Sequence, residues 1–272
     1  NYNDLISNYK DKFFPKTTCD TELLSWLLDN IPYEKVLSNL VDSMHAFAWY
    51  DKSNNEIILS RDHAGIKPLY FAFINSGIIF CSEIKGLLSH VKDSNIIDRH
   101  ALACTSSLGV NVLRQTIFKG IYKVLPGETI VYSIDQKKIK RSFRTFVKPY
   151  SNKKLNIDDF LQITSSTINK ATLGIRKIGI FLSGGIDSSL IAYELNKNLQ
   201  NISSFTNIME PNEILNGEDH NSDAKVANLF SKSLDFNHHE VRITPDTISD
   251  YWNSTIKYME EPRYNWNLPM YY

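Results

Sequence analysis

One segment, IGIFLSGGIDSSLIAYELNKN at positions 178–198, constrains the fold of this chain more than any other. Its apolar start runs directly into Ser-Gly-Gly, and the residues after the loop repeat apolar side chains at helical spacing. The pattern predicts a strand over residues 178–182 and a helix over residues 188–198, joined by a short glycine-containing loop. A strand that passes through a tight loop into a helix is a building unit of α/β folds.

The alternation of strands and helices continues after this segment. Strands are predicted over residues 203–208 and 238–243, with a helix over residues 222–234 between them. An earlier helix is predicted to start after Asn156, a residue type that caps helix N-termini, and to continue to residue 168. Because parallel strands need long connections, this order predicts a parallel sheet with right-handed helical crossovers.

The loop after the first of these strands has the chemistry of a phosphate site. The carboxyl end of a parallel strand meets a helix N-terminus there, which offers unpaired N–H groups and a positive dipole. Gly184 and Gly185 let the backbone approach a ligand closely, and Ser183 and Ser188 add hydroxyl donors. Asp187 would repel a bare phosphate, so we expect it to hold a divalent cation that bridges to the phosphates.

The residue order in the loop excludes two better-known phosphate sites. The chain has neither a GxxxxGKS or GxxxxGKT loop nor a GxGxxG dinucleotide fingerprint. The simpler alternative is a Gly-Gly turn with a serine cap that joins strand and helix for packing alone. We favour the phosphate site because each residue type has its own chemical role there: the serines offer hydroxyl donors, the glycines allow close backbone approach and the aspartate can hold a cation.

The first half of the chain has a different pattern. A leucine stripe predicts a helix over residues 20–30, and aromatic and β-branched residues then predict antiparallel strands with hairpin turns. The strands are expected over residues 45–51, 55–62, 68–74, 77–83, 128–135 and 138–144. A polar connector at residues 147–156 follows. We therefore predict an α+β domain at residues 1–147 and an α/β domain at residues 148–272.

Composition narrows the class of partners. Thirty lysine and arginine residues balance thirty aspartate and glutamate residues, so the net charge of zero favours neither nucleic acid nor an anionic membrane. No segment has the length and apolarity of a transmembrane helix, and the polar start is no signal peptide. Cys19, Cys81 and Cys104 form no CxxC pair, and we expect all three to be small buried residues in a cytoplasmic protein.

Several segments resemble those of a known enzyme family. LSGGIDSS, at 182–189, is similar to the pyrophosphate loop of the ATP pyrophosphatase superfamily, whose members split ATP into AMP and pyrophosphate. Five segments of the first half resemble the glutaminase domain of class B, glutamine-hydrolysing asparagine synthetases, in the same order. They are CDTELL at 19–24, MHAFAWYD at 44–51, SRDHAGIKPLYF at 60–71, CSEIKGL at 81–87 and TIFKGIYKVLPGE at 116–128.

The resemblance implies a fold and a reaction. Residues 1–147 would form part of an N-terminal-nucleophile glutaminase domain of αββα architecture, and residues 148–272 the first part of an ATP pyrophosphatase domain, similar to adenine nucleotide alpha hydrolases. The family releases ammonia from glutamine with an N-terminal cysteine, which here would lie upstream of residue 1, so we expect no catalytic residue within the chain. The ammonia then amidates an adenylated carboxylate, aspartate in the family. ATP and Mg²⁺ are the implied cofactors, and a homodimer the implied assembly.

The same resemblance implies roles for individual residues. Asp20 aligns with the carboxylate that binds the α-amino group of glutamine. Asn207 would lie near the adenine, and Asp219 aligns with an acidic residue near the nucleotide, although a solvated loop carboxylate is an equal alternative for it. Asp187 would hold the metal. The residues that would bind the ATP phosphates are Ser183, Gly184, Gly185, Asp187 and Ser188.

Several alternatives stay open. The segment MEEPRYNWNLPMYY, residues 259–272, is similar to the family's stretch over the acceptor site, but its aromatic residues depart from the usual polar ones. The acceptor could therefore be a sugar or a carboxylate other than aspartate, and a nucleotide-binding relic without catalysis is the non-enzyme alternative. A tRNA-thiolating enzyme is disfavoured because all three cysteines precede the loop. His238 and His239 suggest a metal site, but adjacent strand residues face opposite sides of a sheet, which favours a structural role.

Overall fold

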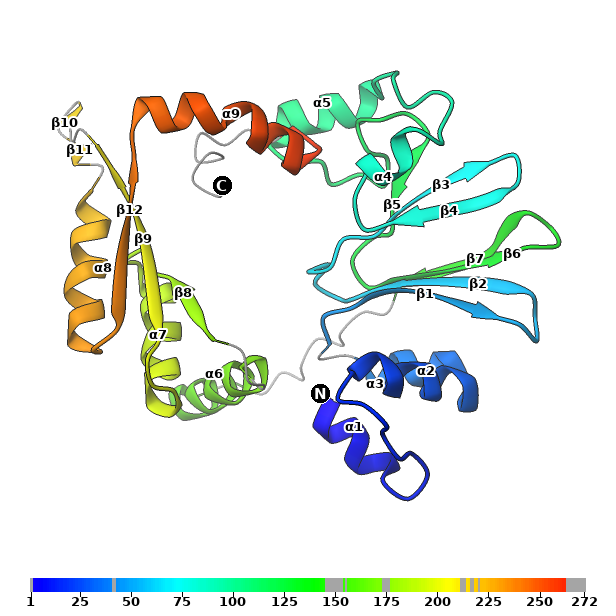
Figure 1. The fold of residues 1–272 in the computed structure, drawn as a ribbon, viewed down its shortest axis with the longest axis horizontal. Coiled ribbons are helices and arrows are strands. Elements are labelled where there is room, and N and C mark those ends of the chain that lie inside the picture. Colours follow the sequence, from blue (N-terminus) through cyan, green and yellow to red (C-terminus); the bar gives the residue numbers. More distant parts are fainter. Residues whose placement is uncertain are drawn as a thin grey trace. The chain divides into compact units, whose positions relative to one another are not determined.

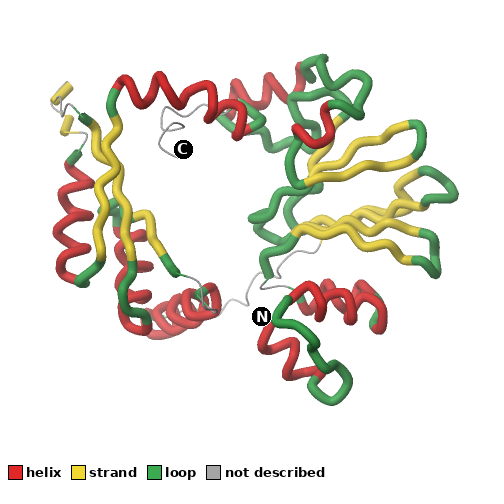
Figure 2. Tube along the Cα trace, in the orientation of Figure 1, coloured by secondary structure: helices red, strands yellow, loops and turns green. Residues whose placement is uncertain are grey.

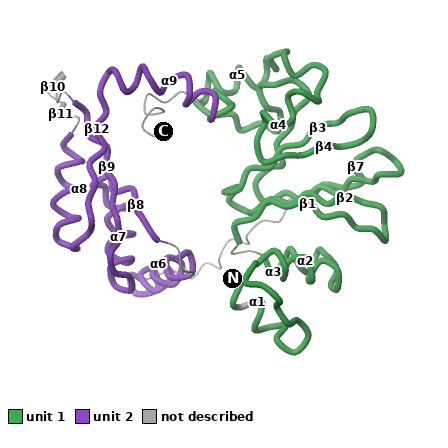
Figure 3. The backbone as a smooth tube through the Cα atoms, in the orientation of Figure 1, with its two compact units in different colours: residues 1–149, 259–265 green, residues 150–258, 266–272 purple. Residues whose placement is uncertain are grey.

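The chain folds into two compact units, which are described one at a time. The computed structural model describes residues 2–40, 43–144, 154, 156–172, 177–210, 214–215, 218–219 and 221–262. Both units contain helices and strands (Figures 1 and 2). Unit 1 comprises Asn1–Pro149 and Met259–Asn265, and unit 2 comprises Tyr150–Tyr258 and Trp266–Tyr272 (Figure 3). The predicted domain boundary at residues 147 and 148 lies outside the described residues.

Two antiparallel sheets form the centre of unit 1. The four-stranded sheet has the order β1-β2-β6-β7, and the three-stranded sheet has the order β4-β3-β5. The strands are β1 (Ala46–Asp51), β2 (Glu56–Arg61), β3 (Tyr70–Ile74), β4 (Gly77–Cys81), β5 (Ile121–Lys123), β6 (Glu128–Ser133) and β7 (Lys138–Arg144). Tight turns join β1 to β2 and β3 to β4, as the sequence predicts. Buried apolar side chains of the two sheets, among them Leu59, Phe71 and Ile130, pack against each other.

Helices cover the outer faces of both sheets in unit 1. The helices are α1 (Tyr2–Tyr9), α2 (Asp20–Asn30), α3 (Tyr33–Asn39), α4 (Lys85–Leu88) and α5 (Arg99–Leu108). The first three bury a leucine-rich core, including Leu23 and Leu27, against Phe47 of β1. On the other side, Leu87 of α4 packs against Ala72, the neighbour of Phe71 on β3. Since successive strand residues face opposite sides of a sheet, the layers of unit 1 are helices, sheet, sheet and helices.

A three-stranded parallel sheet organises unit 2, in the order β12-β9-β8. Its strands are β8 (Gly179–Phe181), β9 (Ser203–Met209) and β12 (Asn237–Ile243), and the short strands β10 (Ile214–Leu215) and β11 (Glu218–Asp219) pair with each other. The helices are α6 (Ile157–Ala171), α7 (Ile186–Asn198), α8 (Ser222–Ser233) and α9 (Pro245–Met259). Helices α7 and α8 connect successive strands and share with the sheet a buried core that contains Leu182, Ala192 and Ala227. The parallel pairing agrees with the prediction from sequence.

Two helix starts show what the local sequence determines. Asn156 caps α6 as predicted, since its side chain accepts a hydrogen bond from Asp159 N at 2.7 Å and the Asp159 carboxylate accepts one from Asn156 N at 3.4 Å. Helix α7 begins at Ile186, two residues before its predicted start. Asp187 and Ser188 therefore lie in the first helical turn. The sequence analysis did not predict α1, α3, α4, α9, β5, β10 or β11. Of these, α1, α3 and β5 are short elements held by contacts with distant residues.

The cysteines and the helix lengths bear on two further expectations. All three cysteines are free, and Cys81 and Cys104 are partly buried. Cys19 is exposed, so the expectation of three buried cysteines is wrong for this residue, which occupies the N-cap position of α2 where the chain faces solvent. Within the described part of the chain, no helix is long and apolar enough to cross a membrane.

Candidate nucleotide-binding loop

The loop between β8 and α7 starts from a rigid end. Leu182, the residue after β8, is almost fully buried, and its backbone N–H donates to the carbonyl of Phe205 on β9 at 2.9 Å. This bond extends the pairing of β8 with β9 by one residue and fixes the direction in which the chain leaves the sheet. The next residue, Ser183, is therefore presented at the carboxyl edge of the sheet.

Gly184 takes a conformation that only glycine adopts readily. Its φ is +78°, and a Cβ atom added to it would lie 2.3 Å from the carbonyl oxygen of Asp223 and 3.2 Å from Ala227 N, both on α8. The loop thus presses directly against the first turns of α8. The next glycine differs, because Gly185 has a φ of −74° and a Cβ added there would meet only Ser183 Oγ, at 3.4 Å. Gly184 is the residue at which the loop geometry excludes a side chain.

The two serines of the loop lock it through their hydroxyl groups. Ser183 Oγ lies 3.0 Å from Ser188 Oγ and accepts a hydrogen bond from Gly185 N at 3.3 Å. Ser188 Oγ accepts from Ser183 N at 3.2 Å and donates to the carbonyl of Gly185 at 3.1 Å. These bonds close a ring across the loop and link its two ends. An anion would meet a preformed cradle.

The N-terminus of α7 is open. Gly185 is the N-cap residue, and no side chain caps the helix. The first N–H groups of a helix lack partners within the helix, and together with the helix dipole they favour an anion at that end. The phosphate that the sequence predicts at this point stays a prediction.

Asp187 lies at the same helix end. It belongs to the first turn of α7 and is exposed, and no hydrogen bond or ion pair holds its carboxylate within the part of the chain that the structure describes. An unengaged carboxylate of this kind suits a hard cation with oxygen ligands. Within the same described residues, no group of three or more His, Cys, Asp and Glu side chains could hold a metal by itself. A cation at Asp187 would need further oxygen ligands from a phosphate or from water.

Asn207 lies at the same edge of the sheet as the loop. The last residue of β8, Phe181, pairs with Phe205, and Asn207 comes two residues later on β9, opposite Val241. Its side chain is exposed. The parallel sheet therefore brings the carboxyl end of β9, with Asn207, to the edge where the Ser-Gly-Gly loop begins.

Asp219 has structural partners of its own. Its carboxylate forms an ion pair with Lys225 Nζ at 2.6 Å and accepts a hydrogen bond from Asn221 N at 3.0 Å. Asp219 is therefore tied to the start of α8 rather than fully solvated. The alternative of a solvated loop carboxylate therefore does not describe Asp219, and its position near the nucleotide stays a prediction.

The sequence reading missed Asn221, which has a clear structural role. Its side chain is buried, accepts a hydrogen bond from Met209 N at 2.7 Å and donates to the Met209 carbonyl at 2.9 Å. Asn221 thus fastens the end of β9 to the N-terminus of α8, the helix that contacts Gly184. The only signal in the sequence was an asparagine directly before a helical pattern.

The remaining predicted residues lie elsewhere. Asp20 lies in unit 1, where it is exposed at the first position of α2. Its Oδ1 accepts a long hydrogen bond of 3.5 Å from Thr21 Oγ1. In unit 2, His238 Nδ1 lies 2.9 Å from Ser204 Oγ, whereas the ring of His239 stacks on Phe205 with the centroids 5.0 Å apart. The two histidines have separate partners, in agreement with the structural role favoured from the sequence.

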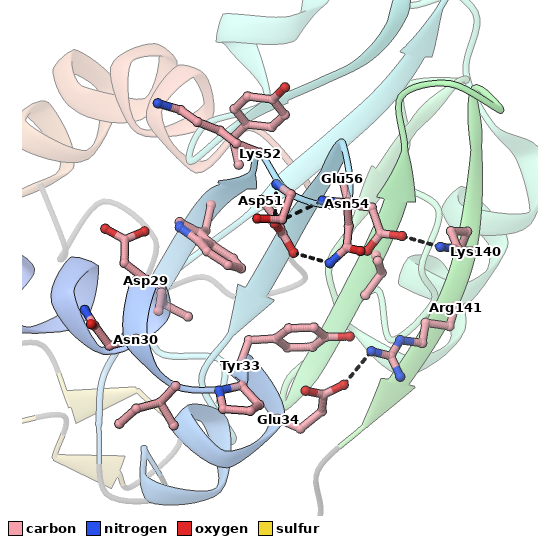
Figure 4. Close-up of a pocket in the computed structure, with 17 residues that line it drawn as sticks. Asp29, Asn30, Tyr33, Glu34, Asp51, Lys52, Asn54, Glu56, Lys140 and Arg141 are labelled. Atoms are coloured by element: carbon pink, nitrogen blue, oxygen red, sulfur yellow. Dashed lines mark hydrogen bonds and ion pairs between the residues drawn. The ribbon is translucent and has the colours of Figure 1, made fainter.

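Unit 1 also contains an open pocket of about 970 Å³ (Figure 4). It is lined by the end of α2, the start of α3, the β1–β2 turn and β7, and none of the sequence-predicted site residues lines it. Glu34 pairs with Arg141 at 2.5 Å, Glu56 pairs with Lys140, and Asp51 accepts from Asn54 Nδ2 at 2.7 Å. These contacts engage four of the charged side chains and Asp51, and Asp29 and Lys52 also line the pocket.

Comparisons with known proteins identify both parts of the chain. A family model described as a glutamine amidotransferase domain matches residues 1–145, and one described as asparagine synthase matches residues 161–272. The glutamine-hydrolysing asparagine synthetase 2 of Bacillus subtilis is 27% identical over 264 residues, covering 89% of this chain and 33% of that protein. The glutamine-hydrolysing asparagine synthetase 1 of the same organism is 30% identical over 197 residues, covering 70% of this chain and 30% of that protein.

These matches define the class as a glutamine amidotransferase domain joined to an asparagine synthase domain. The chain belongs to the family of glutamine-hydrolysing asparagine synthetases. It spans about a third of the length of the curated relatives that it matches. Among solved structures, an NMN synthetase from Francisella tularensis matches with a TM-score of 0.30 and 19% identity, covering 38% of this chain and 41% of that one.

Proposed function

We propose that the protein that carries this chain performs ATP-dependent amide synthesis with glutamine as the nitrogen source. A carboxylate, aspartate or another acceptor, attacks the α-phosphorus of ATP and releases pyrophosphate, and ammonia from glutamine then displaces AMP. The observation that carries the proposal is the loop at residues 183–188, whose hydroxyls lock a backbone cradle beside the open N-terminus of α7. The family membership supports it. We propose the nucleophile-type glutaminase fold for residues 1–147 and the ATP pyrophosphatase fold for residues 148–272.

The loop residues would act on the leaving pyrophosphate. The N–H groups at the start of α7 would donate to phosphate oxygens, and Gly184, having no side chain, leaves the loop backbone close to α8. Ser183 and Ser188 hold the cradle in shape, so little reorganisation is needed when charge develops on the pyrophosphate. Asp187 would hold Mg²⁺, which when bound supplies charge neutralisation for the phosphates.

Three further residues complete the proposed assignments. Asn207 would contact the adenine from the edge of the sheet, and Asp219 would lie near the nucleotide while its ion pair with Lys225 steadies the start of α8. Asp20, exposed at the start of α2, would bind the α-amino group of glutamine. We further propose that the protein acts as a homodimer.

Binding of Mg-ATP by this chain tests the loop assignment directly. Isothermal titration should show binding that weakens when magnesium is withdrawn. In Asp187→Asn we expect the gain in ATP affinity that magnesium provides to fall at least tenfold, which is about 1.4 kcal/mol or more of binding free energy. Asp246→Asn is the matched control, because Asp246 is also an exposed aspartate in the first turn of a helix of unit 2. Equal magnesium dependence in Asp187→Asn and the control would refute the metal assignment.

A further inference from the structure

The pocket of unit 1 contains two opposite charges that its internal contacts leave unused. Two ion pairs and the turn around Asp51 engage the other five charged side chains of its lining. The remaining two are Asp29, in the last turn of α2, and Lys52, in the turn between β1 and β2 (Figure 4). Both are exposed, and neither side chain has a hydrogen bond or an ion pair with another described residue. The pocket therefore offers one free carboxylate and one free ammonium group.

The end of α2 favours a cation beside Asp29. The last carbonyl groups of a helix lack partners within it, and the negative end of the helix dipole lies there. The last turn of α2 contains no basic residue, and Asp29 adds a further negative charge. A carboxylate at this end of a helix is unfavourable by itself. A ligand ammonium group bound to Asp29 would offset that repulsion.

The pocket also has a wall suited to an aromatic group. Trp49 of β1 lines it and is only partly buried, and Leu28 and Ile31 add apolar surface from the end of α2. The Tyr33 hydroxyl, from another lining residue, is buried without a hydrogen-bond partner among the described residues. Such a group is costly until a ligand atom or a water molecule meets it. The volume of about 970 Å³ is within the range of small-molecule pockets.

We propose that this pocket binds a free aromatic amino acid in its zwitterionic form. Asp29 binds the ammonium group, Lys52 binds the carboxylate, and the side chain of the ligand packs against Trp49. An anion without an amine would leave Asp29 unused and would meet a lining of four carboxylates against three cationic groups. A cation without a carboxylate would leave Lys52 unused. Only a ligand with both charges engages both free groups.

This pocket is separate from the predicted glutamine contact. Asp20 is the first residue of α2 and Asp29 the last but one. At 1.5 Å per residue, the helix holds them about 14 Å apart. The inference does not depend on the proposed function, because no step of the proposed reaction uses a residue of this pocket.

Calorimetric titration of the full-length protein with three probes of the same aromatic body tests the proposal. L-Phenylalanine has both charges, phenethylamine lacks the carboxylate, and 3-phenylpropionate lacks the amine. We expect L-phenylalanine to bind about threefold more tightly than either analogue, because an exposed ion pair contributes up to about 1 kcal/mol. Saturating glutamine should not displace L-phenylalanine.

Two variants assign the two charges separately. Asp29→Asn should weaken the binding of L-phenylalanine and phenethylamine about threefold and leave 3-phenylpropionate unchanged. Lys52→Gln should weaken L-phenylalanine and 3-phenylpropionate to a similar extent and leave phenethylamine unchanged. Neither variant removes a contact between described residues, so both should fold. Asp11→Asn is the matched control, since Asp11 is an exposed aspartate of unit 1 outside the pocket.

Three results would overturn the proposal. The first is no binding of L-phenylalanine at concentrations up to about 10 mM. The second is equal affinity for L-phenylalanine and both analogues, because the charges of the ligand would then play no part. The third is binding that Asp29→Asn and Lys52→Gln affect no more than Asp11→Asn does, which would assign the ligand to another site.

Discussion

Replacing Gly184 by alanine is the most informative single perturbation of the loop. At a φ of +78° a residue with a Cβ is disfavoured by roughly 1–2 kcal/mol. The added Cβ would also lie 2.3 Å from the Asp223 carbonyl oxygen, whereas such contacts are essentially absent below 3.0 Å, so the loop and α8 must separate by at least about 0.7 Å. Overpacking of this kind costs roughly 1–3 kcal/mol. We therefore expect Gly184→Ala to destabilise unit 2 by roughly 2–5 kcal/mol.

Gly185→Ala is the matched control for this prediction. Gly185 has an ordinary φ of −74°, and its added Cβ would meet only Ser183 Oγ at 3.4 Å. Denaturant unfolding of the two variants and the wild type, followed by a probe of unit 2, measures the difference in free energy. Mg-ATP binding should weaken along with stability in Gly184→Ala. If the two alanine variants unfold within about 0.5 kcal/mol of each other, then the contact between the loop and α8 is not as described.

Three further predictions concern other polar contacts. Asn221→Ala should destabilise the chain by roughly 1–3 kcal/mol, because Met209 N and O lose buried partners, and an unchanged unfolding free energy would contradict this. Ser188→Ala breaks the ring across the loop, so we expect roughly tenfold weaker ATP binding, and equal affinity by titration would contradict it. Burial lowers the pKa of His45 from 6.5 to about 4. As the pH falls, His45 is therefore protonated in the unfolded chain before it is protonated in the folded one, and the free energy of unfolding decreases by up to about 3 kcal/mol between pH 6.5 and pH 4. His45→Phe should lack this part of the pH dependence of the unfolding free energy, and an unchanged slope would contradict the assignment.

The sequence was most informative where a signal is local. The capping pattern at Asn156 and the hairpin turns of unit 1 depend on residues a few positions apart, and each was predicted correctly. The order of strands and helices likewise predicted the parallel pairing in unit 2. The start of α7 was placed two residues late because Ser188, a typical cap residue, instead binds back to Ser183 from within the helix.

The contacts that depend on distant residues could not be predicted in this way. Asp187, Ser188 and Gly184 were singled out from the loop itself, but the reason that Gly184 must be glycine lies in Asp223 of another helix. Asn221 resembles an ordinary surface residue in the sequence, and only the fold reveals its partners. The exposure of Cys19 was missed for the same reason, since burial depends on packing that no short pattern specifies.

The most direct test of the central claim is to measure pyrophosphate release from Mg-ATP by the full-length protein, with ammonium as the nitrogen source. Ammonium makes the measurement independent of glutamine hydrolysis. The account predicts that aspartate, or another carboxylate acceptor, stimulates the release and that AMP and the amide form in equal amounts. Bound ATP that yields no pyrophosphate with any carboxylate acceptor would contradict the proposed function, and would leave the loop at residues 183–188 with a role in binding alone.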